Sequence, residues 1–250
     1  MPWIRRISRL SSSEKEGIYR TLIPPSLYHC FGIDPLSLCN AKGEKVVRFF
    51  CPRGDRTCLV EIKLADATHV LYSIQLSDTN DSTQIDWDFL IVNDLSSPSF
   101  DTHIDSEGRD TLFGWGSRNI DEEKKAMETG LFPGQVTKGL GLTREVIQVL
   151  EFFCRMFDIK SIRLEALFYH NAVTYERYGF SYFNGYAQMK RIHELFQPGG
   201  SLFENLDNST PFRKPELAHT VRGRSWATVS YTHLRAHETS LPISYAVFWL

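Results

Sequence analysis

The stretch Gly139-Leu140-Gly141-Leu142-Thr143 opens the part of the chain that decides the fold. The apolar side chains that follow Thr143 recur at helical spacing over a wide face, which predicts a helix that is largely buried. Residues 161–167 (Ser-Ile-Arg-Leu-Glu-Ala-Leu) then predict a strand in the interior of a sheet. A glycine turn, a helix and a strand therefore follow one another directly.

A short helix is expected next, over residues 172–178. Asn171 stands where a side-chain oxygen can cap the first N–H groups of this helix. Gly179 can close it in the left-handed conformation that glycine adopts without strain. The segment ends in Tyr175-Glu-Arg-Tyr-Gly-Phe180.

This order of elements, with its glycine turn and its Tyr-x-x-Tyr-Gly-Phe ending, resembles the acyl-CoA-binding half of the GNAT superfamily of acyltransferases over about residues 135–183. The resemblance implies an α/β (α+β) fold, in which helices flank a mixed sheet. In the family, an Arg/Gln-x-x-Gly-x-Gly turn holds the pyrophosphate of acyl-CoA. Here Val136 stands at the first position of that pattern. The resemblance makes Lys138, Gly139, Leu140 and Gly141 cofactor-binding residues, with acyl-CoA (acetyl-CoA) as cosubstrate and no metal.

The chemistry of the turn agrees with that role. Glycines let the backbone approach a ligand closely, and a helix N-terminus offers unpaired N–H groups to a phosphate. Tyr175 keeps the family spacing of four residues before Gly179, which implies that it protonates the departing CoA thiolate. The family's asparagine position is occupied by Phe168, and Asn171 takes the usual alanine position. We keep Asn171 as a cofactor-binding candidate.

Strands are also predicted before this segment, at residues 46–51, 58–64, 68–76 and 85–92, joined as antiparallel neighbours by short turns. The last of them carries Asp88, our candidate for a catalytic general base. Asp86 lies on the same face, and further acceptors alternate beyond the strand, at Asp101, His103, Asp105 and Glu107. Such a run can line an amine site, bind a hard cation or form a solvated edge.

The predicted organisation has four parts. Residues 1–45 form an N-terminal arm, and residues 46–193 form the GNAT-like domain. A long insertion at 93–135 interrupts that domain and contains a helix near 120–129 capped by Asn119. Residues 194–227 form a C-terminal extension, and residues 228–250 a tail.

The tail resembles translated sequencing-library adapter. Residues 229–239 (Val-Ser-Tyr-Thr-His-Leu-Arg-Ala-His-Glu-Thr) match a transposase mosaic end, and residues 243–248 match an outer flow-cell adapter. We therefore expect residues 228–250 to belong to no native fold, and we expect the native chain to continue differently after Ala227. This interpretation also removes a zinc reading of His233 and His237 at helical spacing.

Composition restricts the partners. The formal net charge is −2 at pH 7, so no global basic field points to nucleic acid. No stretch approaches the ~18 apolar residues of a membrane span, and no signal peptide is recognised. A cytoplasmic protein with no membrane and no nucleic-acid partner is expected. Its partner would be a small-molecule or peptide amine, and its oligomeric state stays open.

Cysteine spacing leaves one further alternative. Cys51 and Cys58 flank a turn between two predicted strands, and together with Cys30 and Cys39 they allow a four-thiolate zinc site. Free thiols are the simpler interpretation. The expected function is transfer of an acyl group from acyl-CoA to an amine. The alternatives are a non-catalytic GNAT-like binding or regulatory protein, which the departures at Val136 and Phe168 would favour, and a metal-dependent binding module.

Overall fold

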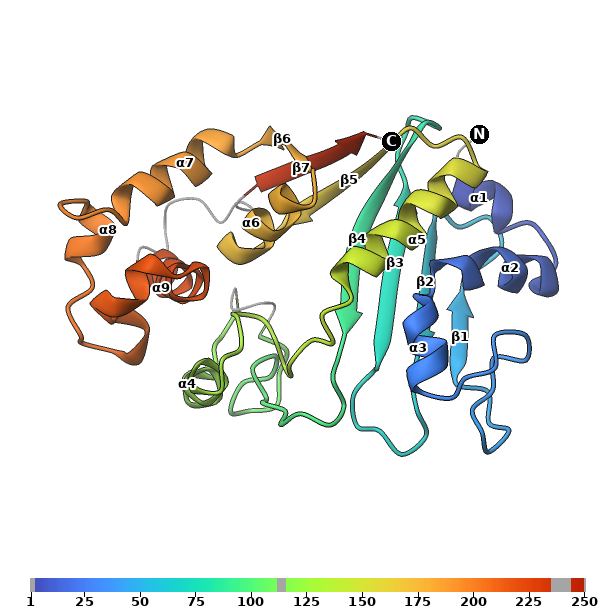
Figure 1. Cartoon of the computed structure of the whole chain (residues 1–250), viewed down its shortest axis with the longest axis horizontal. Coiled ribbons are helices and arrows are strands. Elements are labelled where there is room, and N and C mark those ends of the chain that lie inside the picture. The colour runs from blue at the N-terminus through green and yellow to red at the C-terminus, as the bar shows by residue number, and fades with distance from the viewer. Residues whose placement is uncertain (1–2, 112–115, 235–243, 250) are drawn as a thin grey trace. The chain divides into compact units, whose positions relative to one another are not determined.

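The computed structural model describes residues 3–111, 116–234 and 244–249 (Figure 1). These residues divide into two compact units. The first unit comprises the described parts of Met1–Ser96, Gly139–Leu164 and Val247–Leu250. The second unit comprises the described parts of Ser97–Lys138 and Glu165–Ala246.

A mixed, open sheet organises the first unit. Its neighbouring strands are β1 (Val47–Phe50), β2 (Thr57–Ile62), β3 (Tyr72–Asp78), β4 (Gln84–Val92) and β5 (Ser161–Ala166). The first four pair antiparallel in chain order, and β5 pairs parallel with β4. The predicted mixed sheet flanked by helices is therefore present. The largest difference in strand boundaries is at the predicted third strand, where bends and loop occupy residues 68–71 and β3 begins only at Tyr72.

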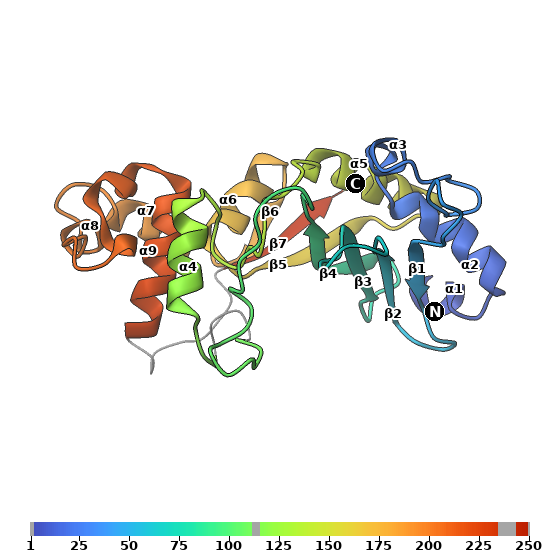
Figure 2. The same cartoon turned by 90° about the horizontal axis from the view of Figure 1, so that it is seen from below.

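Helices cover one face of this sheet. α5 (Thr143–Met156) buries the stripe that its sequence predicted, and it lies with α3 (Pro25–Cys30) over the same face of the antiparallel strands in Figures 1 and 2. The strands present alternate apolar side chains to that face, as β2 does with Cys58, Val60 and Ile62.

The N-terminal arm is an integral part of the first unit. It contains α1 (Trp3–Ile7), α2 (Ser12–Tyr19), the 3₁₀ turn η1 (Arg20–Leu22) and α3. The carboxylate of Asp78, at the end of β3, accepts the first N–H groups of α1, from Ile4 at 2.9 Å and Arg5 at 2.8 Å. The hydroxyl of Tyr72 donates to the carbonyl of Leu22 at 2.6 Å. These long-range hydrogen bonds hold the arm against the sheet.

The second unit is mainly helical. Its helices are α4 (Ile120–Glu128), α6 (Tyr169–Arg177), α7 (Tyr186–Leu195), α8 (Ser201–Glu204), η3 (Pro211–Arg213), η4 (Pro215–His219) and α9 (Val221–Leu234). Asn119 caps α4 as predicted, accepting the N–H of Glu122 at 3.4 Å. Buried side chains of α6, α7 and α9 share one hydrophobic cluster, which includes Ala172, Met189 and Ala227. The predicted C-terminal extension is thus packed into this unit.

The strand order continues beyond β5 with β7 (Ser244–Trp249) and β6 (Ser181–Asn184). The tail that we interpret as adapter-derived therefore includes the last residues of α9 and the strand β7, while its residues 235–243 and 250 lie outside the described residues. The adapter origin of this tail stays a prediction.

Candidate functional site

The glycine turn is tied to the end of β4. Gly139 forms an isolated antiparallel bridge with Asn93, and the N–H of Leu140 donates to the carbonyl of Val92 at 3.3 Å. A Cβ on Gly139 would lie 3.3 Å from that carbonyl oxygen, which is tighter than an ordinary contact. Gly141 has φ +73°, in the left-handed region that glycine enters without strain. The chain can therefore turn from β4 directly into α5.

The first turn of α5 presents free backbone donors. Its first helical hydrogen bond runs from Val146 N–H to Leu142 C=O at 2.9 Å, and Leu142 offers no side-chain cap. The N–H groups from Thr143 to Glu145 have no acceptor among the described residues. Lys138, which precedes the turn in the chain, is exposed and likewise has no ionic partner among them. Unpaired N–H groups and the helix dipole make this end attractive to an anion.

The edge of β4 that leads to this turn is open. The parallel ladder with β5 covers only Gln84–Trp87. Beyond it, the N–H of Asn93 donates to the carbonyl of Leu71 at 2.9 Å, so Asn93 directs its backbone groups toward the β3 side. Because alternate residues of an antiparallel strand point to opposite sides, the N–H and C=O of Leu90 point away from β3. Within the described chain no strand pairs with Leu90 on that side. An extended ligand with amide groups can bind such an edge as a strand does.

A β-bulge places Asp88 where this open edge begins. Gln75 pairs with Phe89 and Leu76 with Trp87, so Asp88 is the extra residue on β4. Its carboxylate accepts hydrogen bonds from the Ser77 hydroxyl at 3.0 Å and from Gln75 Nε2 at 3.4 Å. The Asp88 residue is exposed, but the surrounding protein partly desolvates its carboxyl group and thereby raises its pKa. The hydrogen bonds from Ser77 and Gln75 oppose this shift. A raised pKa suits a general base.

The neighbouring carboxylate has a structural partner. Asp86 forms a bidentate ion pair with Arg163 of β5, with both N–O distances at 2.8 Å. This pair lies on the last part of the parallel ladder. Asp86 is therefore engaged in holding β4 to β5, whereas Asp88 has only neutral partners among the described residues. Of the two predicted carboxylates, Asp88 is the one without a cationic partner among the described residues, and it stays our candidate base.

The predicted cap at Asn171 is wrong. α6 begins at Tyr169, and Phe168 is its N-cap residue, without a side-chain cap. The carbonyl of Phe168 accepts the N–H groups of Asn171 (3.0 Å) and Ala172 (3.3 Å), so Asn171 lies inside the first turn. The chain leaves β5 at Ala166 and enters the helix almost at once, which places the helix start earlier than the Asn-cap pattern indicated.

Tyr175 lies on α6 in the second unit. It is partly buried and packs on the cluster that includes Tyr169 and Ala172. Its ring centroid is 5.6 Å from that of Phe180, and burial raises its pKa to about 12. The phenol is therefore protonated at neutral pH, as a general acid must be. Gly179 has φ +92°, the predicted left-handed conformation.

A buried histidine next to these residues was not anticipated. The ring of His170 stacks on Phe132 (4.5 Å between centroids) and Phe168 (5.7 Å). Its nitrogens lie 2.8 Å from the Ser225 hydroxyl and 3.3 Å from Asn171 Nδ2. Burial lowers the pKa of His170 to about 3. No local pattern announces this site, because Phe132 and Ser225 are distant in sequence.

The buried, neutral His170 makes the stability of the protein depend on pH. The unfolded chain binds a proton at this residue below about pH 6.5, and the folded chain does so only near pH 3. The stabilisation is complete above pH 6.5, and we expect it to fall by about 1.4 kcal/mol per pH unit as the pH decreases between these values. Urea unfolding of wild type and His170→Gln from pH 7 to pH 4.5 measures this. Parallel pH dependences of the two proteins would contradict the prediction.

The acidic run beyond β4 does not form a cation site. Asp105 is buried, and its carboxylate accepts the N–H groups of Glu107 (2.9 Å) and Arg109 (3.0 Å). Ser117 donates a further bond at 2.9 Å. These hydrogen bonds, that of the Arg109 N–H first, lower the pKa of Asp105 to about 2. Asp105 therefore closes its own loop in the second unit, and its oxygens are already engaged.

The cysteines are free thiols, and two of them lie opposite each other. By the register of β1 and β2, Cys51 and Cys58 continue the ladder as opposite residues, and both are buried. The Tyr19 hydroxyl lies 3.3 Å from Cys51 Sγ. Cys30 is exposed, and in the part of the chain that the structure describes no three His, Cys, Asp or Glu side chains gather as metal ligands. The four-thiolate site allowed by the sequence is not formed by these residues.

Comparison with known proteins adds no assignment. No family model, no curated protein and no solved structure matches this chain. Among the described helices, none combines the length and the apolar character needed to cross a bilayer.

Proposed function

We propose that this protein transfers an acyl group from acyl-CoA to an amine, within a GNAT-like fold. One observation carries the proposal: the free edge of β4 runs from the bulge at Asp88 to the glycine turn at the N-terminus of α5. From Asp88 to Val92 this edge is roughly 13 Å long, at about 3.3 Å per residue. A carboxylate stands at one end and an anion site at the other.

Acyl-CoA has groups that suit each part of this edge. The amides of its pantetheine arm would pair with the free N–H and C=O of Leu90, as an added strand would. The pyrophosphate would take the backbone of Gly139–Gly141 and the free N–H groups of α5, with Lys138 supplying charge. The family resemblance adds Asn171 as a further cofactor contact. Acetyl-CoA is the simplest cosubstrate of this type, and no metal is required.

The reaction would begin at the bulge. Asp88 takes a proton from the attacking amine nitrogen as that nitrogen bonds to the thioester carbonyl carbon. The carbon–sulfur bond then breaks to give the acylated amine and free CoA, and the family resemblance assigns protonation of the departing thiolate to Tyr175. Alignment of the thioester with the amine would supply much of the rate enhancement. The acceptor would be a small-molecule or peptide amine in the cytoplasm.

A second candidate is a GNAT-like protein that binds acyl-CoA without catalysis. The observation that favours it is the position of Phe168, which replaces the family's asparagine and takes part in packing: its ring stacks on His170 and lies against Gly134, where a Cβ would come within 2.5 Å of it. Binding and turnover separate the two candidates. Thermal stabilisation by acetyl-CoA or longer acyl-CoAs supports both, whereas release of free thiol in the presence of amines supports only the enzyme. No stabilisation by any acyl-CoA would overturn both.

The glycine turn gives the sharpest binding test. In Gly141→Val, a β-branched side chain at φ +73° forces the turn to change, although no atom lies near the new Cβ. We expect the variant to fold and to lose stabilisation by acyl-CoA. Gly199→Val is the matched control, because Gly199 has φ +84°, also has open space and lies in the second unit. Normal acyl-CoA binding by Gly141→Val would remove the pyrophosphate role of the turn.

A further inference from the structure

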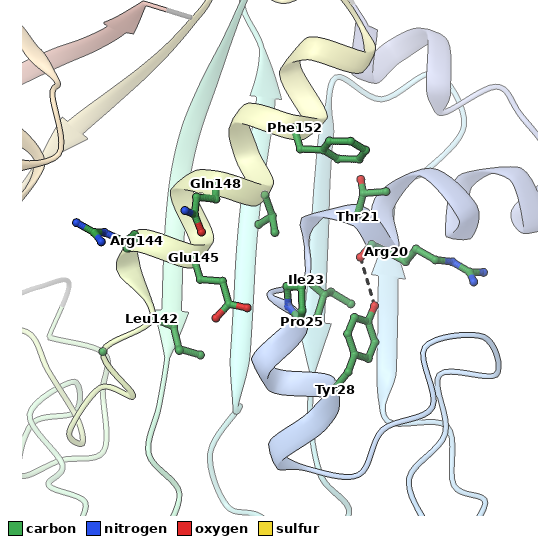
Figure 3. Close-up of a pocket in the computed structure, with 12 residues that line it drawn as sticks. Arg20, Thr21, Ile23, Pro25, Tyr28, Leu142, Arg144, Glu145, Gln148 and Phe152 are labelled. Carbon is green, nitrogen blue, oxygen red and sulfur yellow. Dashed lines mark hydrogen bonds between the residues drawn. The ribbon is translucent and has the colours of Figure 1, made fainter.

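The first unit contains a pocket of about 700 Å³ beside the glycine turn. One wall is the N-terminal half of α5, and the other is the N-terminal arm, at η1 and α3 (Figure 3). Gly141 and Leu142 belong to the lining, so the pocket opens next to the proposed pyrophosphate site. Its volume lies within the usual range of small-molecule pockets, about 300–1,000 Å³.

The pocket is lined mainly by apolar atoms, with an aromatic side chain on each wall, Tyr28 on the arm and Phe152 on α5. Ile23, Pro25 and Val149 line it, and the ring of Phe152 extends from α5 toward the arm. Phe152 is 55% exposed, an unusual state for a phenylalanine in the middle of a helix. A flat, apolar group that stacked on this ring would remove it from water.

A single carboxylate points into this interior. Glu145 Oε1 accepts the N–H of Ser26 at 2.9 Å, which caps the start of α3. Its other oxygen has no hydrogen-bond partner among the described residues. Because the bond to Ser26 holds the side chain in place, this second oxygen is a preoriented acceptor. The interior therefore favours a flat apolar ligand that carries a hydrogen-bond donor and disfavours an anionic group.

The rim of the pocket has the opposite character. The guanidinium of Arg144 has no ionic partner among the described residues, and in Figure 3 it extends from α5 on the side away from the arm. The free N–H groups of the first turn of α5 belong to the same end of the helix as Arg144. A ligand that crosses this helix end would therefore meet donors and positive charge at the rim before its flat part reached Phe152.

We propose that this pocket binds an aminopurine nucleotide, with the base against Phe152, its exocyclic amine donating to Glu145 and its phosphates at the rim by Arg144. The inference rests on the proposed function, because acyl-CoA carries an adenosine beyond the pyrophosphate, and that adenosine would extend from the glycine turn into the pocket. It assigns a role to the N-terminal arm, which lies outside the residues of the family resemblance. The arm would supply the second wall of a nucleotide site.

The test compares two exposed apolar residues on the same helix. Phe152→Ala removes the ring from the pocket, and Met156→Ala, one turn later and 44% exposed, removes a similar apolar area outside it. Loss of one base-stacking contact weakens binding by about 1–3 kcal/mol, or roughly 5- to 150-fold. We expect this loss for ADP and acetyl-CoA in Phe152→Ala only. Calorimetry of the full chain with ADP, inosine diphosphate, acetyl-CoA and acetyl-pantetheine measures it.

The four probes separate the two proposals. Acetyl-pantetheine lacks the nucleotide, so its binding should be the same in Phe152→Ala and wild type, and ADP should bind tighter than inosine diphosphate, which lacks the exocyclic amine. Acetyl-CoA binding that is equal in both variants would overturn the nucleotide pocket and leave the acyl-CoA proposal standing. ADP binding that depends on Phe152, without any binding of acetyl-CoA or acetyl-pantetheine, would support the pocket and overturn the acyl-CoA proposal. Absence of binding by every probe would overturn both.

Discussion

Asp88→Asn is expected to lower kcat/KM by about 10²–10⁴ while acyl-CoA binding and folding are retained. The substitution keeps the size of the side chain and one of the two oxygens that accept from Ser77 and Gln75, but it removes the negative charge that makes the carboxylate a base. Initial rates of thiol release with a responsive amine, together with calorimetry of acetyl-CoA, measure the two parts of this result.

Asp86→Asn is the control for loss of negative charge on the same strand. Asp86 pairs with Arg163 at the surface, so its removal should change stability slightly and leave the reaction intact. If Asp88→Asn and Asp86→Asn gave the same rate, Asp88 would not be the base.

The pH profile adds an independent assignment. A base works in its ionised form, so the rate should rise with pH through the pKa of Asp88, which lies above the ordinary aspartate value. Ser77 lowers that pKa by donating to the carboxylate. Ser77→Ala should therefore move the acid limb of the profile to higher pH. An unmoved limb would mean that another group, such as the amine itself, determines it.

Tyr175→Phe is expected to reduce turnover by a similar factor, about 10²–10⁴, because a general acid would be lost. The substitution removes one hydroxyl and leaves the ring that packs against Phe180. Folding and acyl-CoA binding should therefore survive. Product formation under single-turnover conditions is the appropriate measurement, because it isolates the step in which the carbon–sulfur bond breaks.

Tyr178→Phe provides the matched control on the same segment. Tyr178 is partly buried and ends α6, and nothing in the proposed reaction uses its hydroxyl. Equal, near-normal rates for the two phenylalanine variants would leave Tyr175 as a packing residue and would favour the non-catalytic candidate.

Local patterns predicted much of the fold. The alternation in residues 58–64 gave β2 within two residues at its end, and the apolar stripe after Thr143 gave α5 from its first residue. These signals are strong because each element buries one face, and burial imposes its period on the sequence. The start of α6 was missed because this helix begins at Tyr169 without a side-chain cap, so no capping residue marks its first turn in the sequence.

Long-range features were beyond reach of the sequence. The bulge at Asp88 depends on the register between β3 and β4, which no local pattern specifies. The pocket depends on the arm folding onto α5, and the hydrogen bond from Ser26 to Glu145 that joins them spans 119 residues of sequence. His170 is likewise defined by partners from distant segments, and its neutral state follows from their packing.

The bulge in β4 leaves part of the strand edge unpaired, at the cost of backbone hydrogen bonds to β5. The ladder to β5 ends at Trp87, immediately before the extra residue Asp88. A regular strand could have continued this ladder and gained further backbone hydrogen bonds, but it would have had no edge to offer a ligand. A single added residue is thus associated with an unpaired strand edge in the middle of a sheet, where strands are normally paired on both sides. A sequence change that removed the bulge would therefore stabilise the sheet and at the same time remove the edge at which a ligand could bind.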